Sequence, residues 1–268
     1  MNPLVSVVTV SLNAAATIDD TLASVGLQRV EFGIEHICVD GGSRDATRSI
    51  IERRASTWPH IRRVFEPDRG IFDAMNKGLA AATGNYVLFL NADDFLVASG
   101  TFATAMRGVG KDDAGNPDLI LGDATMGVIG RFGIWRHRRV PCVLAKFRGT
   151  GFYPVHQGQF TRRRLLENVG GFDARQRLAA DVNQFYDLER RFRPTVRLLK
   201  TDIAFMQAGG AANAGLAAMA LGTREIFKVQ ADSVGATRAA GMALAKTLQS
   251  VSELRFGRCP HSRWFAIT

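Results

Sequence analysis

The sequence predicts an α/β protein built on a doubly wound, mainly parallel sheet, with a helical extension after it. The first observation is that β-branched apolar runs alternate with helical patterns over the first hundred residues, as they do when helices connect parallel strands. The second is that polar residues follow each of these runs. The third is an alanine-rich stretch from 216 to 250, which has helical composition.

Four strands are expected in the first half, with three helices between them. Thr17 is expected to cap the first helix and Ser43 the second, and Gly84 is expected to end the third. The predicted strands are 5–10, 35–39, 61–65 and 86–90, and the predicted helices begin at 17, 46 and 74, the last two ending at 54 and 82. Later come a strand at 118–123, irregular structure or short hairpins over 127–158, and renewed helix from Ala179.

Composition and charge narrow the class of protein. Apolar residues make up 46% and charged residues 22% of the 268 residues, which is typical of globular proteins, and no apolar run approaches the ~18 residues of a membrane span. The N-terminus lacks the basic and apolar regions of a secretory signal, so none is expected. Three scattered cysteines (Cys38, Cys142 and Cys259) predict neither a disulfide framework nor a metal knuckle, and they favour the cytoplasm.

The net charge of +9 is concentrated in one window. Nine basic residues and no acidic residue lie between Asp123 and Glu167, whereas 25 of each sign lie elsewhere. Such a field attracts nucleic acid, anionic lipid headgroups or a diphosphate, although any single arginine here is more simply interpreted as part of a solvated face.

The polar residues that follow the predicted strands are expected to meet at one edge of the sheet. These residues are Asn13, Asp40, Asp68 and the segment 91–94, whose sequence NADD ends the apolar run from Tyr86. In parallel α/β sheets, ligands bind beyond the carboxyl ends of the strands. The adjacent carboxylates Asp93 and Asp94 repel each other, so solvent, helix amides or a cation must offset their charge.

The segment EPDRGIFDAMNKG, residues 66–78, places a charged loop ahead of a helix. Asp73 and Lys77 are four residues apart on one helical face, and Arg69 or Lys77 could steady a phosphate. The alternative is an exposed ion pair worth about 0.3–0.5 kcal/mol. Asp40 likewise has two interpretations. It accepts a hydrogen bond from a nucleobase N–H or a ribose hydroxyl, or it only closes the turn after its strand.

Taken together, the motifs SVVTVSLN, VDGGSRDAT, EPDRGIFDAMNKGLAAATG and FLNADD resemble the family 2 glycosyltransferases of bacterial surface polysaccharide and glycolipid assembly. The closest likeness is to colanic-acid-type members with a DxGIYDAMNKG signature. HQGQFTRR and GGFDARQRLAADVNQFYDL match as well, and IAFMQAGGAAN matches more weakly, so the resemblance covers most of residues 1–213. It implies a GT-A fold, a Rossmann-like sheet that binds a nucleotide-diphosphate sugar and a divalent cation. The expected divisions are 1–117 for the nucleotide sugar, 118–213 for the acceptor, and a basic helical extension at 214–268.

The resemblance also implies roles for individual residues. The cation, Mg²⁺ or Mn²⁺, would be held by Asp93, with Asp94 as second choice, because Asn91-Ala92-Asp93 stands where the family has a DxD. The family's tyrosine is Phe72 here, so any role of that hydroxyl is lost. The nucleotide sugar would be contacted by Ser11, Asn13, Asp40, Asp68, Arg69, Asn76, Lys77, Asn91 and Ala92.

The resemblance implies that Asp181 is the base that deprotonates the acceptor hydroxyl in an inverting transfer. Asp181, Phe185, Leu188 and Phe192 follow 4, 3, 4 spacing, so the carboxylate shares the apolar face of its helix. The alternative is a helix-capping aspartate. His156 and Gln157 match a family element and could line the acceptor site, although a lone histidine is more often structural.

The favoured function is therefore an inverting, metal-dependent transferase that moves one sugar from a UDP- or GDP-sugar to a glycan or lipid-linked acceptor. A processive synthase is disfavoured, because Pro260 replaces the glutamine of the QxxRW element before Arg263-Trp264. The alternatives are a catalytically silent nucleotide-sugar-binding scaffold and a nucleic-acid binder, and the latter lacks any recognisable motif. Peripheral attachment to the inner face of the cytoplasmic membrane, through anionic lipid, is a further expectation.

Overall fold

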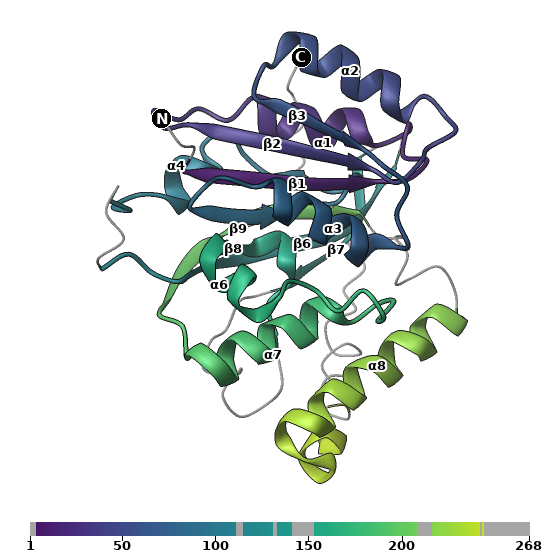
Figure 1. Cartoon of the computed structure of the whole chain (residues 1–268), viewed down its shortest axis with the longest axis vertical. Coiled ribbons are helices and arrows are strands. Elements are labelled where there is room, and N and C mark those ends of the chain that lie inside the picture. The colour runs from purple at the N-terminus through teal and green to yellow at the C-terminus, as the bar shows by residue number, and fades with distance from the viewer. Residues whose placement is uncertain are drawn as a thin grey trace.

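The computed structural model describes residues 4–110, 115–130, 133–140, 153–207, 216–241 and 243, and it confirms the predicted α/β class (Figure 1). The basic side chains between 131 and 148 lie outside the residues whose side chains are described. Cys142, Cys259 and residues 244–268 also lie outside the described part of the chain. No helix among the described residues is both long and apolar enough to cross a bilayer.

The N-terminal half alternates strand and helix as expected. Its elements are β1 (Val5–Ser11), α1 (Ile18–Gly26), β2 (Ile34–Asp40), α2 (Thr47–Thr57), β3 (Ile61–Phe65), α3 (Ile71–Ala81), β4 (Tyr86–Phe89), β5 (Phe95–Leu96) and α4 (Thr101–Ala105). β1 lies at the centre of this half and pairs in parallel with both β2 and β4, while β3 pairs in parallel with β2. The carboxyl ends of β1, β2 and β4 therefore point to the same edge.

The second half extends the same sheet in mixed directions. Its elements are β6 (Leu119–Gly130), β7 (Gly133–Val140), the 3-10 turn η1 (His156–Gly158), β8 (Gln159–Arg162), α6 (Arg163–Val169), α7 (Ala180–Phe192), β9 (Val196–Gln207) and α8 (Leu216–Val234). The strand order is β3-β2-β1-β4-β8-β6-β9-β5, with β7 paired to β6. β8 joins antiparallel to β4 and β6, whereas β6 and β9 run parallel.

Apolar side chains on the two faces of the sheet form separate cores. On one face, Val8 and Val10 of β1 pack with residues of α3, α6 and α7, and on the other, Val5 and Val7 pack with residues of α1 and α4. The period of two along β1 thus separates the faces, and helices cover both sides of the sheet (Figure 1). α3 approaches the sheet closely at Gly78, where a Cβ atom would lie 2.2 Å from Val8 Cγ1.

Several local expectations were wrong. Ser43 does not cap α2, which begins at Thr47, because its hydroxyl bonds to Asp40 instead. Gly84 does not end α3, since the helix stops at Ala81, and the Gly84 amide donates to Ser6 Oγ and to a Glu35 carboxylate oxygen. Thr17 occupies the N-cap position of α1, but its side chain makes no capping hydrogen bond.

Candidate active site at the carboxyl edge of the sheet

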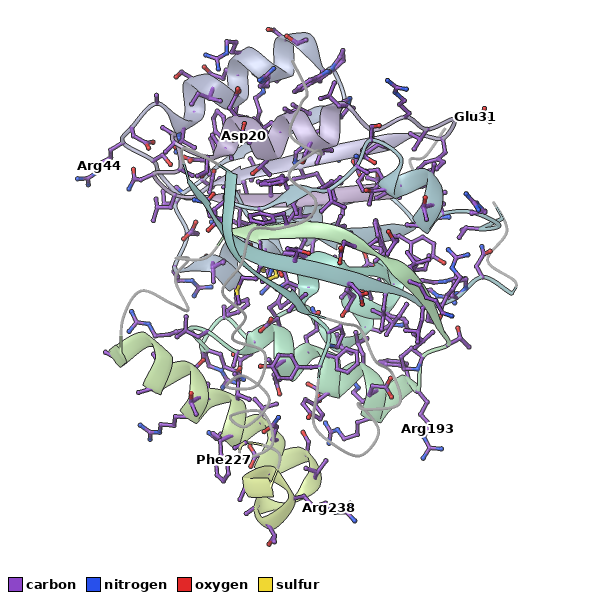
Figure 2. The ribbon with its side chains drawn as sticks, turned by 180° about the vertical axis from the view of Figure 1, so that it is seen from behind. Asp20, Glu31, Arg44, Arg193, Phe227 and Arg238 are labelled. Carbon is purple, nitrogen blue, oxygen red and sulfur yellow. The ribbon has the colours of Figure 1, made fainter. Side chains whose placement is uncertain are left out.

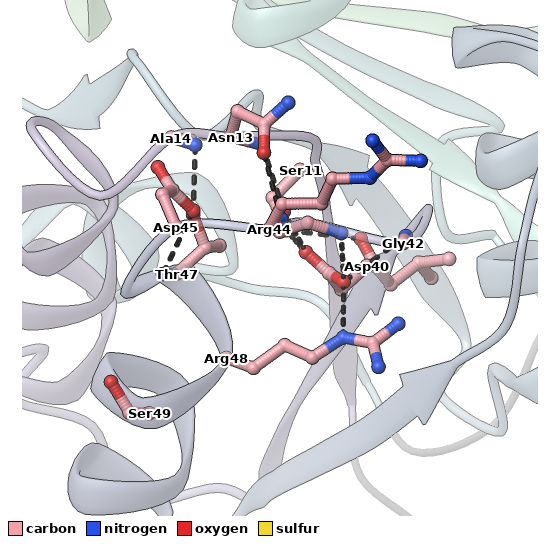
Figure 3. Close-up of polar contacts among 12 residues, drawn as sticks. Ser11, Asn13, Ala14, Asp40, Gly42, Arg44, Asp45, Thr47, Arg48 and Ser49 are labelled. Carbon is pink, nitrogen blue, oxygen red and sulfur yellow. Dashed lines mark hydrogen bonds and ion pairs between the residues drawn. The ribbon is translucent and has the colours of Figure 1, made fainter.

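The loops after β1 and β2 are tied to each other by side-chain to backbone hydrogen bonds (Figure 3). Asn13, at a positive φ of 52°, donates its backbone N–H to Ser43 Oγ at 2.8 Å, and its side-chain Oδ1 accepts from the Arg44 N–H at 2.9 Å. The Ala14 N–H donates to Thr47 Oγ1 at 2.8 Å. Asn tolerates the left-handed region better than most residues, which fits its place in this turn.

Asp40 is fully buried at the end of β2, and its carboxylate is surrounded by donors. It accepts from the backbone N–H groups of Ser43 at 2.9 Å and Gly42 at 3.2 Å, from the Ser43 hydroxyl, from Ser11 Oγ at 3.3 Å and from Arg48 Nε at 2.6 Å. Burial would raise the pKa of Asp40, but the hydrogen bonds from Ser43 and Arg48 outweigh it and hold the pKa below its ordinary value. A nucleobase would therefore have to exchange with one of these donors.

Asp68 lies against the turn that follows Asp40. One of its carboxylate oxygens is 1.9 Å from where a Cβ atom on Gly41 would fall, and its Oδ1 accepts from the Gly70 N–H at 3.0 Å. Glycine is thus required at position 41, because any side chain there would collide with the Asp68 carboxylate. The structure therefore brings Asp40 and Asp68 to one place, as expected.

The basic residues nearby are engaged within their own segment. Arg69 is highly exposed and pairs with Asp73 at 2.9 Å, and Lys77 Nζ donates to the Pro67 carbonyl and lies 3.8 Å from Asp73. The predicted i,i+4 pair is therefore present. Asn76 is half-buried and points elsewhere: its amide donates to the Phe172 carbonyl and accepts from the Phe172 N–H, both at 2.8 Å, so it links α3 to the loop before α7.

The two carboxylates after β4 lie in different environments. Asp94 is buried, with its carboxylate accepting from Gln157 Nε2 at 2.8 Å and from the Gln207 N–H at 3.2 Å. Burial, with the neighbouring charge of Asp93, raises the pKa of Asp94 to about 7. Asp93 is partly buried and faces the pocket, and burial raises its pKa as well. Asn91 adds a buried Oδ1 atom with no hydrogen-bond partner among the described residues.

A pocket of about 200 Å³ joins these residues to α7. His156 and Asp181 both face it, with His156 Nδ1 3.3 Å from Asp181 Oδ2. The remaining atoms, His156 Nε2 and Asp181 Oδ1, are buried and lack a partner within the described residues. The pocket is lined by Ile71, Phe72, Asn91, Asp93, Asp94, Met126, Val155, His156, Gln157, Arg177, Leu178, Asp181, Met206 and Gln207.

Asp181 occupies the first turn of α7, facing inward as its spacing predicted. Phe185 and Leu188 on the same face are buried, but Phe192 is exposed, so the predicted apolar face ends one turn early. A larger, more open depression of about 530 Å³ lies instead where β6 and β9 begin, and its lining includes Asp118, Arg164 and Arg197. That depression is at the opposite end of β6 from the pocket, and Asp93, Asp94 and Asp181 do not line it.

A divalent cation at this site would need oxygen donors beside the pocket. No group of three or more His, Cys, Asp or Glu side chains within the described residues is arranged to enclose a metal. The Asp93 carboxylate and the unpartnered Asn91 Oδ1 are both hard oxygen donors beside the pocket, which fits Mg²⁺ or Mn²⁺ with most positions filled by a ligand or water. Asp94, with both oxygens hydrogen-bonded, is a poorer donor.

Comparison with known proteins gives a consistent result. The model of the family "Glycosyl transferase family 2" matches residues 6–179. A PGL/p-HBAD biosynthesis glycosyltransferase of Mycobacterium bovis is 33% identical over 187 residues, which cover 67% of each chain.

Two solved structures have the same fold at low sequence identity. S. aureus TarS 1–349 has a TM-score of 0.63 at 18% identity, with 93% of this chain and 72% of the 1–349 chain covered. A Pyrobaculum calidifontis mannosyltransferase, solved with GDP-Man and Mn²⁺, has a TM-score of 0.58 at 19% identity, with 99% of this chain and 79% of the mannosyltransferase chain covered. These likenesses confirm the GT-A fold implied by the sequence motifs. The chain belongs to glycosyl transferase family 2 and is a glycosyltransferase.

Proposed function

We propose that the protein is an inverting, metal-dependent glycosyltransferase that moves a single sugar from a nucleotide-diphosphate donor to a glycan or lipid-linked acceptor. The observation that carries the proposal is a pocket lined by both Asp93, in the loop after β4, and Asp181, at the start of α7. A UDP- or GDP-sugar is the proposed donor. In support, TarS has been solved with UDP-GlcNAc and the Pyrobaculum enzyme with GDP-Man.

On the donor side, the tied loops after β1 and β2 form the proposed seat of the nucleoside, with Ser11, Asn13, Asp40 and Asp68 around it. Asp93 and Asn91 would hold Mg²⁺ or Mn²⁺, and Asp94 would keep its hydrogen bonds from Gln157 and the Gln207 N–H beside them. When bound, the cation would neutralise the charge that grows on the departing diphosphate. Arg69 and Lys77 would contribute positive charge beside the phosphates, and they would have to leave Asp73 to do so.

On the acceptor side, Asp181 accepts the proton of the attacking hydroxyl. A general base must lie within hydrogen-bond reach of that proton; Asp181 lines the pocket, and its Oδ1 has no hydrogen-bond partner among the described residues. His156 holds the other oxygen, Oδ2, through Nδ1 and so orients the carboxylate. The deprotonated hydroxyl oxygen then attacks the anomeric carbon from the face opposite the diphosphate. The new C–O bond forms as the bond to the diphosphate breaks, and the anomeric configuration is inverted.

The acceptor is proposed to be a surface glycan or glycolipid, of the colanic-acid type or of the kind that the mycobacterial relative's description names. Ile71, Met126, Leu178 and Met206 are among the residues that line the pocket with Asp181, and apolar lining suits an acceptor with an apolar portion. Peripheral membrane contact is proposed through α8. It presents exposed Arg224, Phe227 and Lys228 side chains, and Phe227 projects outward in Figure 2.

The experiment is a thermal-shift screen of UDP- and GDP-sugars with Mg²⁺ or Mn²⁺, followed by transfer assays with the stabilising donor. Ligand at 100 times its Kd stabilises the native state by about 2.7 kcal/mol. Asp93→Ala is expected to lose the metal-dependent shift. Asp181→Asn is expected to keep the shift but to lower kcat by about 10²–10⁴-fold, the usual contribution of a general base.

The matched control is Asp187→Asn on the same helix, where the carboxylate pairs with Arg190 at the surface. Its kcat should stay within twofold of wild type. Undiminished turnover in both the Asp93 and Asp181 variants would refute the assigned roles. A metal-dependent shift in wild type, without transfer to any glycan or lipid acceptor, would favour the silent scaffold instead.

A further inference from the structure

Helix α8 packs on α7 although it lies beyond the family-matched residues 6–179. Val229 and Ile226 of α8 meet Ala179 and Val182 at the start of α7 in one apolar cluster. Figures 1 and 2 both show α8 beside the lower edge of the α7 layer. The contact therefore falls on the end of α7 that carries Asp181.

The polar centre of this contact is the carboxylate of Glu225. Its Oε1 accepts from the Arg177 N–H at 3.1 Å, and its Oε2 accepts from the N–H groups of Leu178 at 2.8 Å and Ala179 at 3.0 Å. Ala179 is the N-cap residue of α7 and has no side-chain acceptor of its own. A carboxylate at this end of a helix also interacts favourably with the helix dipole.

The three residues held by Glu225 border the pocket. Arg177 and Leu178 line it, and Asp181 follows two residues after Ala179. We infer that Glu225 is a positioning residue: it fixes the entry of α7 and thereby aims Asp181 and the adjacent pocket wall at the acceptor. The inference rests on the proposed role of Asp181 as the base.

The remainder of α7 is anchored without Glu225. Phe185 packs with Leu119 and Leu121 of β6, and Leu188 is buried in the core beneath α3 and α6. Removing Glu225 should therefore loosen residues 177–181 while the helix stays on the sheet. A misplacement of about 1 Å at a catalytic group can lower the rate about 10²-fold, so a local change of this kind is enough to impair transfer.

The test compares Glu225→Ala and Glu225→Gln with Asp232→Ala, a control on the exposed side of α8. Glu225→Ala is expected to lower kcat 10- to 100-fold while the Kd of the nucleotide diphosphate stays within twofold, because α8 packs on α7 whereas the proposed nucleoside seat is formed by the loops after β1 and β2. Glu225→Gln keeps one oxygen acceptor and should fall between wild type and Glu225→Ala. Asp232→Ala should behave as wild type.

Hydrogen–deuterium exchange provides a readout that needs no substrate. Glu225→Ala should speed exchange at 177–181 and leave α1, α2 and α3 unchanged. Unchanged exchange at 177–181, or wild-type kcat in Glu225→Ala, overturns the inference. Equal losses of nucleotide affinity and kcat would also overturn it, since they indicate a global effect. Absence of transfer in wild type would instead refute the proposed function. The exchange experiment would still show whether Glu225 holds residues 177–181 in place.

Discussion

Glu35 is a buried carboxylate on β2 whose removal should be among the most destabilising changes in the N-terminal half. Its side chain is largely buried, and Oε1 accepts from Ser6 Oγ at 2.6 Å, from the Thr83 N–H at 2.5 Å and from the Gly84 N–H at 3.1 Å. Oε2 accepts from Arg62 at 2.7 Å. The residue therefore joins β1 and β2 to the turn between α3 and β4.

The magnitude of the loss follows from these partners. Glu35→Ala leaves the buried Ser6 hydroxyl without an acceptor, which costs about 1–3 kcal/mol, and it also removes the hydrogen bonds from Thr83 and the charge-assisted bond from Arg62. The expected loss in the free energy of unfolding is about 4 kcal/mol, of a total that is typically about 5–15 kcal/mol. Glu35→Gln keeps Oε1 but turns an amide toward Arg62, so about half of that loss is expected.

Urea unfolding followed by circular dichroism measures the change, with an unchanged m-value as the check on two-state behaviour. Glu31→Ala is the control, since Glu31 is exposed on the loop before β2 (Figure 2), and a change within about 0.5 kcal/mol is expected. A loss below about 1 kcal/mol in Glu35→Ala would refute the reasoning that these bonds stabilise the fold.

The same carboxylate gives a pH dependence of known sign. Burial alone would raise the pKa of Glu35, but hydrogen bonds from Ser6, Thr83 and Arg62 outweigh it and hold the pKa below its ordinary value of 4.5. The folded state thus favours the charged form, so this stabilisation is complete above pH 4.5 and is lost as the pH falls below it. The stability difference between wild type and Glu35→Gln should shrink on acidification.

Two further predictions concern buried positions on β1, β2 and α3. Burial and the nearby His60 lower the pKa of His36 from 6.5 to about 3, so the unfolded state binds the proton first and stability should fall by up to about 1.4 kcal/mol per pH unit below pH 6.5. His36→Gln, which can still bond Thr9, should abolish that slope in urea titrations, and an unchanged slope would show that His36 is not its source. Gly78→Ala should destabilise by about 1–3 kcal/mol despite the better helix propensity of alanine, because the new methyl meets Val8, and a rise in Tm would contradict this.

The sequence predicted the first half well because local patterns determine it. Alternating β-branched runs placed β1 to β4 within about one residue, and strand parallelism then predicted that Asp40, Asp68 and Asp93 follow strands ending at one edge. The caps failed where a tertiary partner competed for the same group. Ser43 bonds to Asp40, and the Gly84 amide bonds to Glu35, neither of which helix propensity can show.

The second half was predicted less well because its contacts are distant in sequence. Glu225 accepts hydrogen bonds from residues that precede it by 46 to 48 positions, and the Gln207 N–H donates to Asp94 across 113 positions. Hydrogen bonds over such separations leave no local pattern in the sequence. The division of labour between Asp93 and Asp94 also depends on burial, which two adjacent aspartates in a sequence do not reveal. Asn76 belongs to a family motif, but its side-chain amide forms hydrogen bonds with the backbone N–H and carbonyl of Phe172.

The hydrogen bonds between the loops after β1 and β2 have a thermodynamic consequence. Hydrogen bonds from or to Asn13, Ser43, Asp45 and Thr47 hold these loops together. A ligand that docks there meets a surface whose backbone has little freedom left to lose, so the entropic penalty of ordering is small. Calorimetry should then find a modest heat-capacity change for nucleotide alone, and a larger one once an acceptor orders the pocket beside α7.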